Sequence, residues 1–292
     1  RGCDFTGASV AGGVLTRARL DGAIFRDANL SRVNLGSTDL AGADFEGADF
    51  DDAILVGASF AGARLVRANL AEVDFLSLDL GAVDLTEANL RDATLYQTKL
   101  DGARLVGADL TGATLIECTL EDADLRRAVM VGASLITCVG RKASFCEAQL
   151  SKVVVVQSSA FAECDFSDAD MPKANLRGTS LRGAQFDRAA MPGSDLSECD
   201  LTGASLERAD LSGSMLIRTT LVSASLRGAN LVDALLSKAR IAGADFTGAN
   251  LYRADVSRAI GDADTTFAEA EVGHVRYEPK ANLDPPSQGG AA

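Results

Sequence analysis

Residues 41–70 read AGADFEGADFDDAILVGASFAGARLVRANL, and this stretch repeats a pattern of five residues. A large apolar residue fills every fifth position, and a small residue, most often alanine, lies two positions before it. The same frame runs from Phe5 to Val155, with Gly140 as its one non-apolar member. It then slips by one residue and continues, apolar throughout, from Phe161 to Val256. A repeat of this length determines the architecture, so every other feature has to be interpreted within it.

A period of five fits neither an α-helix nor a continuous β-strand. On a helix, five residues advance by about 500°, so the apolar side chains would point in all directions. On a strand, an odd spacing would send successive apolar residues to opposite faces. The pattern becomes consistent if the backbone turns a corner every five residues, with the apolar and small residues pointing inward. Stacked coils would then pair as parallel ladders about 4.8 Å apart.

Two details favour four sides, and therefore four five-residue units, in each coil. Met171-Pro172 and Met191-Pro192 are the same dipeptide, separated by four units. Proline has no backbone N–H, so each proline removes one hydrogen bond between coils. If the two prolines stack, the missing hydrogen bonds all fall in one column. The second detail is an outward apolar column, described below. We therefore predict an all-β chain folded as a right-handed quadrilateral parallel β-helix of about 13 coils.

The five-residue unit resembles the consensus Ala-Asp/Asn-Leu-x-x of the pentapeptide repeat proteins. Ala43-Asp44-Phe45, Ala68-Asn69-Leu70 and Ala249-Asn250-Leu251 carry the resemblance, which covers roughly residues 3–256. It implies a right-handed quadrilateral β-helix, in agreement with the four-sided interpretation. It also implies a mainly non-catalytic protein, and some quinolone-resistance members of the family mimic DNA to bind a type II topoisomerase. Because the repeat encodes only the rod, that activity does not follow from it.

The repeat predicts three segments along the chain. Residues 1–256 form the pentapeptide-repeat β-helix, with an irregularity near 140–160 where one extra residue enters. Residues 257–277 are expected to form an irregular C-terminal coil or cap. Residues 278–292, rich in proline and glycine, are expected to be a disordered tail or linker. The chain opens inside a repeat, which suggests a fragment of a longer protein.

Composition and charge exclude several classes of function. A net charge of −13 argues against direct binding of nucleic acid, and the longest aliphatic run, Val153–Val156, is far shorter than a membrane span. A filled rod offers no cleft in which a carboxylate pair could be tuned for catalysis. We therefore expect no enzyme activity, no cofactor and no metal site. Five of the six cysteines lie at the small inward position, which indicates buried free thiols and a cytoplasmic, reducing location.

One outward column of the coil is apolar. Taken once per coil, it would form a stripe about 25 Å long, and exposed apolar patches of this size commonly mark contact surfaces. The alternative is that β-branched residues simply favour the surfaces of strands. The contact could be a homodimer or a covering domain. This apolar stripe comprises Val56, Leu76, Tyr96, Ile116, Ile136 and Val156.

The adjacent side of the coil is rich in carboxylates. Such a ladder could imitate a phosphate backbone, although Arg32, Arg91 and Lys152 interrupt it. The alternative is charge that keeps the rod soluble. This acidic side comprises Asp49, Asp51, Asp52, Glu72, Asp92 and Asp109.

Together these features predict a non-catalytic, rigid protein-binding scaffold. In its most specific form it would be an acidic DNA mimic that binds a type II topoisomerase such as gyrase. The alternative is a structural or targeting module of a larger bacterial multidomain protein, associated with secretion. The full open reading frame would separate the two.

Overall fold

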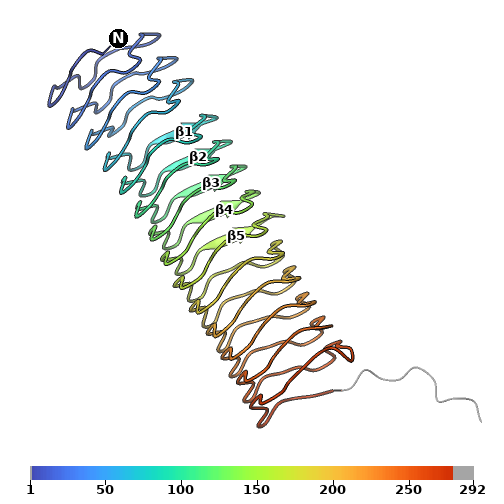
Figure 1. The fold of residues 1–292 in the computed structure, drawn as a ribbon. Helices are drawn as coiled ribbons and strands as arrows, with labels where there is room; N and C mark the ends of the chain where they lie inside the picture. The colour runs from blue at the N-terminus through green and yellow to red at the C-terminus, as the bar shows by residue number, and fades with distance from the viewer. Residues whose placement is uncertain (1, 279–292) are drawn as a thin grey trace, which may run out of the picture.

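The computed structural model describes residues 2–278, which form a four-sided parallel β-solenoid (Figure 1). Parallel bridges join each coil to the next, beginning with Asp4 and Ile24. Five short strands lie one above the next in the order β1-β2-β3-β4-β5 and form a parallel sheet along one side of the rod. We call this side the strand face. The strands are β1 (Asp74–Leu76), β2 (Thr94–Tyr96), β3 (Thr114–Ile116), β4 (Ser134–Ile136) and β5 (Val154–Val156).

The predicted all-β, four-sided fold is therefore confirmed, and the described residues contain no helix. The count of about 13 coils stays a prediction.

Apart from the corners that follow the strands, the corners are four-residue turns, and this explains where glycine recurs. In the turn 45–48, the Ala48 N–H donates to the Phe45 carbonyl at 3.0 Å, and Gly47 has a φ of 67°. A positive φ at the third residue defines a type II turn and favours glycine there. Proline fits the second position of the same turn. The Pro172 carbonyl accepts a ladder hydrogen bond from the Lys152 N–H. The N–H of Ser197, at the equivalent turn position, donates to the Asp195 side chain and not to the next coil, so our expectation that the stacked prolines cost the ladder its donors was wrong.

The core consists of the large and small residues that the repeat places inside. Ala48 and Phe50 are fully buried, and the same alternation continues through most of the rod. Phenylalanines in the same column of successive coils stack, as Phe25 does on Phe45 with ring centroids 5.1 Å apart. Stacked rings add about 1 kcal/mol per pair beyond the burial of their surface. The inward orientation inferred from the five-residue pattern is therefore correct.

The corners that follow the strands are joined by side chains from the next coil. At an ordinary corner, the Ala58 N–H donates to the Leu55 carbonyl. After β1, the Phe75 carbonyl accepts the hydroxyl of Thr98 at 2.7 Å, and after β2 the Leu95 carbonyl accepts the thiol of Cys118 at 3.2 Å. These buried side-chain donors replace the backbone N–H that closes an ordinary corner. The backbone therefore stays extended for one more residue before it turns. That residue is β-branched or large in each strand, which suits an extended backbone.

The extra residue of the repeat lies at Gln157 and Ser158. Both have positive φ, 59° and 61°, and they precede the buried Ser159. Bridged residues on either side of this point are separated by one residue more than elsewhere, as Val154 and Asn175 are. The insertion is absorbed at a corner, so the columns on either side of it stay aligned.

The ladder also continues beyond residue 256. A second one-residue shift appears between the bridges Arg240–Ile260 and Asp245–Thr266. This last coil is less buried than the rest, with Phe267 and Val272 exposed. The limits of the three segments stay a prediction, and the tail expected over 278–292 lies outside the described residues except for its first member.

Gly140, the exception in the apolar frame, leaves no vacancy in the core. A Cβ placed on Gly140 would lie 2.8 Å from Cε1 of Phe161 and 3.2 Å from Cβ of Leu120. The ring of Phe161, one coil later, therefore fills the space that a leucine would have occupied at position 140.

Restoring the consensus at this position should destabilise the rod. We expect Gly140→Leu to lower the free energy of unfolding by about 1–3 kcal/mol, because it overpacks the core against Phe161. Gly140→Leu combined with Phe161→Leu should recover part of the loss. Chemical denaturation of the three proteins checks this, and a Gly140→Leu protein more stable than the wild type would contradict it.

Candidate functional site

The six residues of the apolar stripe lie in one column of the strand face. The sheet register aligns Leu76, Tyr96, Ile116, Ile136 and Val156, each the last residue of its strand. Val56 precedes them by one coil and exposes 52% of its surface, while Leu76 exposes 45%. The other four are half-buried. The structure thus brings five of the six together on one sheet; Val56 lies in the coil before it, and no bridge joins Ile54 to Asp74 on this side.

A second column widens this apolar surface, and the sequence reasoning missed it. This column, two positions before the stripe residues, holds the apolar Ile54 and Val154 and the β-branched Thr94 and Thr114, but it is interrupted by Ser134 and by the exposed carboxylate of Asp74. Period-two alternation within a side could have revealed them. The surface then stops, because Asn175 and Arg177 fill the two columns in the next coil.

Three further apolar residues lie beyond this interruption. Met215 and Leu235 pair in the first column, and Ile217 lies in the column of the stripe. These three residues therefore form a patch separate from the apolar stripe.

The six residues of the acidic side do not form one ladder. Asp49 and Asp109 lie mid-face on the neighbouring side, whereas the other four lie at the corner that leads to the strand face. Asp49 accepts a hydrogen bond from the Asn69 amide at 2.8 Å, as part of a stack of amides, and Asp109 lies 3.1 Å from Arg91.

Partial burial would raise the pKa of Asp109, but hydrogen bonds from Thr111 and Arg91 hold it below its usual value. Within the described residues, no ion pair engages Asp51, Asp52, Glu72 or Asp92. These four are therefore the exposed carboxylates that remain available to a partner.

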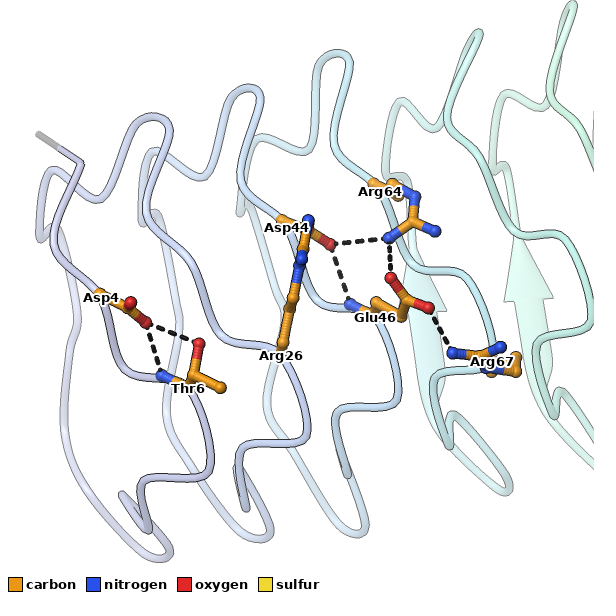
Figure 2. A network of polar contacts seen from close by, with 7 residues as sticks. All are labelled: Asp4, Thr6, Arg26, Asp44, Glu46, Arg64 and Arg67. Atoms are coloured by element: carbon orange, nitrogen blue, oxygen red, sulfur yellow. Dashed lines mark hydrogen bonds and ion pairs between the residues drawn. The ribbon is translucent and has the colours of Figure 1, made fainter.

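Another side of the coil carries a network of opposite charges (Figure 2). The Asp44 carboxylate forms ion pairs with Arg26 at 2.7 Å and with Arg64 at 3.2 Å. The Glu46 carboxylate forms ion pairs with both Arg64 and Arg67. Burial opposes ionisation of Asp44, but the hydrogen bonds it accepts lower its pKa, and the bond from Arg64 lowers the pKa of Glu46. This side of the rod is neutralised internally and offers no continuous acidic surface.

Four of the six free cysteines are buried in the core, and only Cys3 is exposed. Contact with the Cys138 sulfur and burial raise the pKa of Cys118 far above its ordinary value. Burial raises the pKa of Cys164 and of Cys199 to about 12. Buried thiols of this kind are unreactive because the thiolate is the nucleophile.

The described part of the chain shows no group of three His, Cys, Asp or Glu side chains placed to hold a metal ion. Over the same residues, no helix of the length and apolarity needed to cross a membrane is found.

Comparison with known proteins identifies the repeat. The family described as "Pentapeptide repeat region" matches residues 28–105. The family described as "Pentapeptide repeats (8 copies)" matches residues 1–36, 88–127, 103–139, 118–154, 161–197, 194–231 and 229–260. These matches leave out 155–160, the segment that holds the insertion. A search of curated proteins found no significant match.

Solved structures with similar folds include three pentapeptide repeat proteins. HetL from Nostoc sp. strain PCC 7120, involved in the regulation of heterocyst differentiation, is 27% identical over 83% of this chain and 89% of its own, with a TM-score of 0.42. Trypsin-treated QnrB1, a plasmid-mediated fluoroquinolone resistance protein, is 17% identical over 94% and 92%, with a TM-score of 0.36. A protein of the Arabidopsis thaliana thylakoid lumen is 31% identical over 39% and 68%, with a TM-score of 0.18.

The thiols should react according to their burial. In native protein, iodoacetamide should modify Cys3 readily and the half-buried Cys146 more slowly, because burial and Asp165 raise the pKa of Cys146. Cys118, Cys138, Cys164 and Cys199 should react only after denaturation. Peptide mass spectrometry over a time course checks this, and early labelling of a core cysteine would contradict the packing described above.

Proposed function

The chain belongs to the pentapeptide repeat family, and we propose that it is a non-catalytic scaffold that binds another protein through the apolar stripe. The observation that carries this proposal is the strand face itself. Its stripe column is apolar from Val56 to Val156, Val56 and Leu76 expose about half of their surface, and the column beside it is polar at Asp74, Thr94, Thr114 and Ser134. A soluble protein rarely leaves a contiguous apolar patch of this kind uncovered.

The rod suits such a role because it presents the stripe without rearrangement. From β1 to β5, backbone hydrogen bonds join each coil to the next along the strand face, such as the Ser77 N–H to the Tyr96 carbonyl at 2.8 Å, whereas no backbone hydrogen bond joins residues 51–57 to residues 71–77. The side chains beneath the stripe, among them Phe75 and Leu95, are buried in the core. Binding to such a preorganised surface costs little conformational entropy.

The carboxylates support a non-catalytic role. A general acid or base near neutral pH needs a carboxyl group whose pKa is raised by burial or by a neighbouring negative charge. Asp44, Asp109 and Asp124 have their pKa lowered by hydrogen bonds and arginine partners. Such groups stay ionised and contribute to structure. The free cysteines also fit the cytoplasm, where thiols stay reduced.

A second candidate function is the DNA mimic. It is favoured by the net charge of −13 and by the exposed carboxylates of Asp52, Glu72 and Asp92, which recur once per coil at one corner. These three span only about 10 Å at the spacing of stacked strands, and Arg32 precedes them at the same corner. The apolar stripe is longer than this acidic run, so we favour the scaffold.

Two charges placed on the stripe should weaken binding without unfolding the rod. We expect Leu76→Asp with Ile116→Asp to weaken self-association or partner binding about tenfold or more. Stability should change by no more than about 1 kcal/mol, because the positions are surface sites. Analytical ultracentrifugation, co-purification and thermal melting measure these quantities.

A matched control places the same two charges elsewhere. Ala61→Asp with Ala162→Asp lies on another side of the coil and should leave association unchanged. Unaltered association in the stripe variant would show that the stripe is not a contact surface.

The DNA-mimic candidate is tested with gyrase. If it holds, micromolar protein should inhibit DNA supercoiling, and Asp52→Asn, Glu72→Gln and Asp92→Asn together should remove the inhibition, because these carboxylates would replace phosphates. Absence of any effect by the wild-type protein at micromolar concentration would rule this candidate out.

A further inference from the structure

We propose that the partner of the apolar stripe is a second copy of this chain, packed face to face in antiparallel orientation about a twofold axis at Ile116. This inference rests on the proposed contact function of the strand face and names its occupant. The supporting observation is a pattern of charges along one edge of the strand face. A second copy places opposite charges against this pattern only when its rod runs in the opposite direction.

The edge in question is the corner that precedes the strand face. Its residues occupy the same turn position in successive coils and share a positive φ, so their side chains leave the backbone in the same direction. Backbone hydrogen bonds keep the corners stacked, such as the Glu72 N–H to the Arg91 carbonyl and the Asp92 N–H to the Thr111 carbonyl. This edge column reads Asp52, Glu72, Asp92, Gly112, Gly132, Lys152 and Lys173.

The edge column is acidic at one end, neutral in the middle and basic at the other end. All five of its charged side chains are exposed. Arginines elsewhere on the rod pair with neighbouring carboxylates, as Arg64 does with Asp44. Within residues 2–278, by contrast, no ion pair engages Asp52, Glu72, Asp92, Lys152 or Lys173. These charges are therefore available for pairing between molecules.

A twofold axis that lies in the strand face and crosses the rod reverses this order. Such an axis keeps the two copies of the edge column on the same side of the interface. When the axis passes through Ile116, it lies at the height of Gly112 in the edge column. Glu72 lies two coils before Gly112 and Lys152 lies two coils after it, so Glu72 faces Lys152 of the second copy. Lys173 lies three coils after Gly112 and faces the end of the second copy that carries Asp52, but no backbone hydrogen bond stacks Asp52 on the coil of Glu72, so the pairing rests on Glu72 and Lys152. Asp92 faces Gly132, so no like charges meet along this edge.

The same axis also pairs the stripe with itself. The sheet register places Leu76 and Val156 two coils on either side of Ile116, and Tyr96 and Ile136 one coil on either side. Leu76 would therefore contact Val156 of the second copy, Tyr96 would contact Ile136, and Ile116 would contact its own equivalent. Apolar contacts at the centre flanked by charged pairs at the rim are the usual anatomy of a protein interface.

A parallel arrangement lacks this complementarity. A twofold axis along the rod would bring the edge column against the opposite edge of the strand face at the same height. Glu72 would then meet Ser77, and Lys152 would meet Gln157. No opposite charges would face each other, so the edge charges select the antiparallel dimer.

Charge reversal and its repair test the pairing. We expect Glu72→Lys to raise the dimer dissociation constant about tenfold, because two symmetry-related Glu–Lys pairs become repulsive. Adding Lys152→Glu to the same chain should restore the dissociation constant to within about twofold, since the pairs re-form with their signs exchanged. Sedimentation equilibrium at low salt measures both, and the wild-type dimer should weaken as salt rises.

A matched control uses Glu87→Lys. This residue is exposed at a corner away from the strand face, and the change in charge is the same. The dissociation constant should stay at the wild-type value, which separates a local pairing from an effect of net charge.

Cysteine cross-linking reports the orientation. In a background with Cys3→Ser and Cys146→Ser, Ile116→Cys should form a disulfide-linked dimer on oxidation, because the axis passes through this position. Val56→Cys should not cross-link, because antiparallel packing separates its two copies by about 29 Å, six strand spacings. Cross-linking by Val56→Cys would establish the parallel arrangement and overturn the proposal.

The outcomes also separate this inference from the proposed function. A wild-type protein that stays monomeric up to about 100 μM, roughly the weakest affinity expected of a specific dimer, would overturn the dimer. If Leu76→Asp with Ile116→Asp then still abolished binding of a different protein, the contact function of the stripe would stand without it. A dimer unaffected by both the stripe variant and Glu72→Lys would overturn both.

Discussion

The structure depends on one constraint: the backbone must turn after every fifth residue so that each apolar side chain points inward. Neither a helix nor a straight strand can bury a residue at every fifth position. The type II turn, with positive φ at residues such as Gly47, meets this constraint at most corners, and side chains of the next coil close the corners that follow the strands. Four such sides return the chain above its start, so equivalent residues of successive coils, such as Asp4 and Ile24, become neighbours.

This stacking turns positions in the sequence into columns on the surface. Opposite charges that alternate within a column neutralise one another, as Arg64 does with Asp44. Charges that segregate along a column stay unpaired, as at Glu72 and Lys152. Both arrangements use the same backbone, so the rod fixes only the spacing, and the outward residues decide what it can bind. The apolar stripe and the edge column beside it are two adjacent columns of this kind.

Much of the architecture could be predicted because it depends on residues close in the repeat. The inward positions follow from the five-residue period, and the alignment of Leu76, Tyr96 and Ile116 follows from four such units in each coil. Contacts between coils could not be predicted, since they depend on side-chain reach and rotamer. The ring of Phe161 filling the space at Gly140 is one example. The pairing of Asp109 with Arg91, which removes a carboxylate from the acidic side, is another.

The central claim is that four five-residue units close each coil, and a distance between two spin labels tests it most directly. Ser37 and Glu198 occupy the same corner eight coils apart, so nitroxides at Ser37→Cys and Glu198→Cys should lie about 38 Å apart along the rod. Labelled chains diluted with unlabelled protein, in a background lacking Cys3 and Cys146, give this distance by double electron–electron resonance. A measured separation close to that value is what the account predicts. Separations of about 50 Å or about 30 Å, as three-sided or five-sided coils would give, would contradict it.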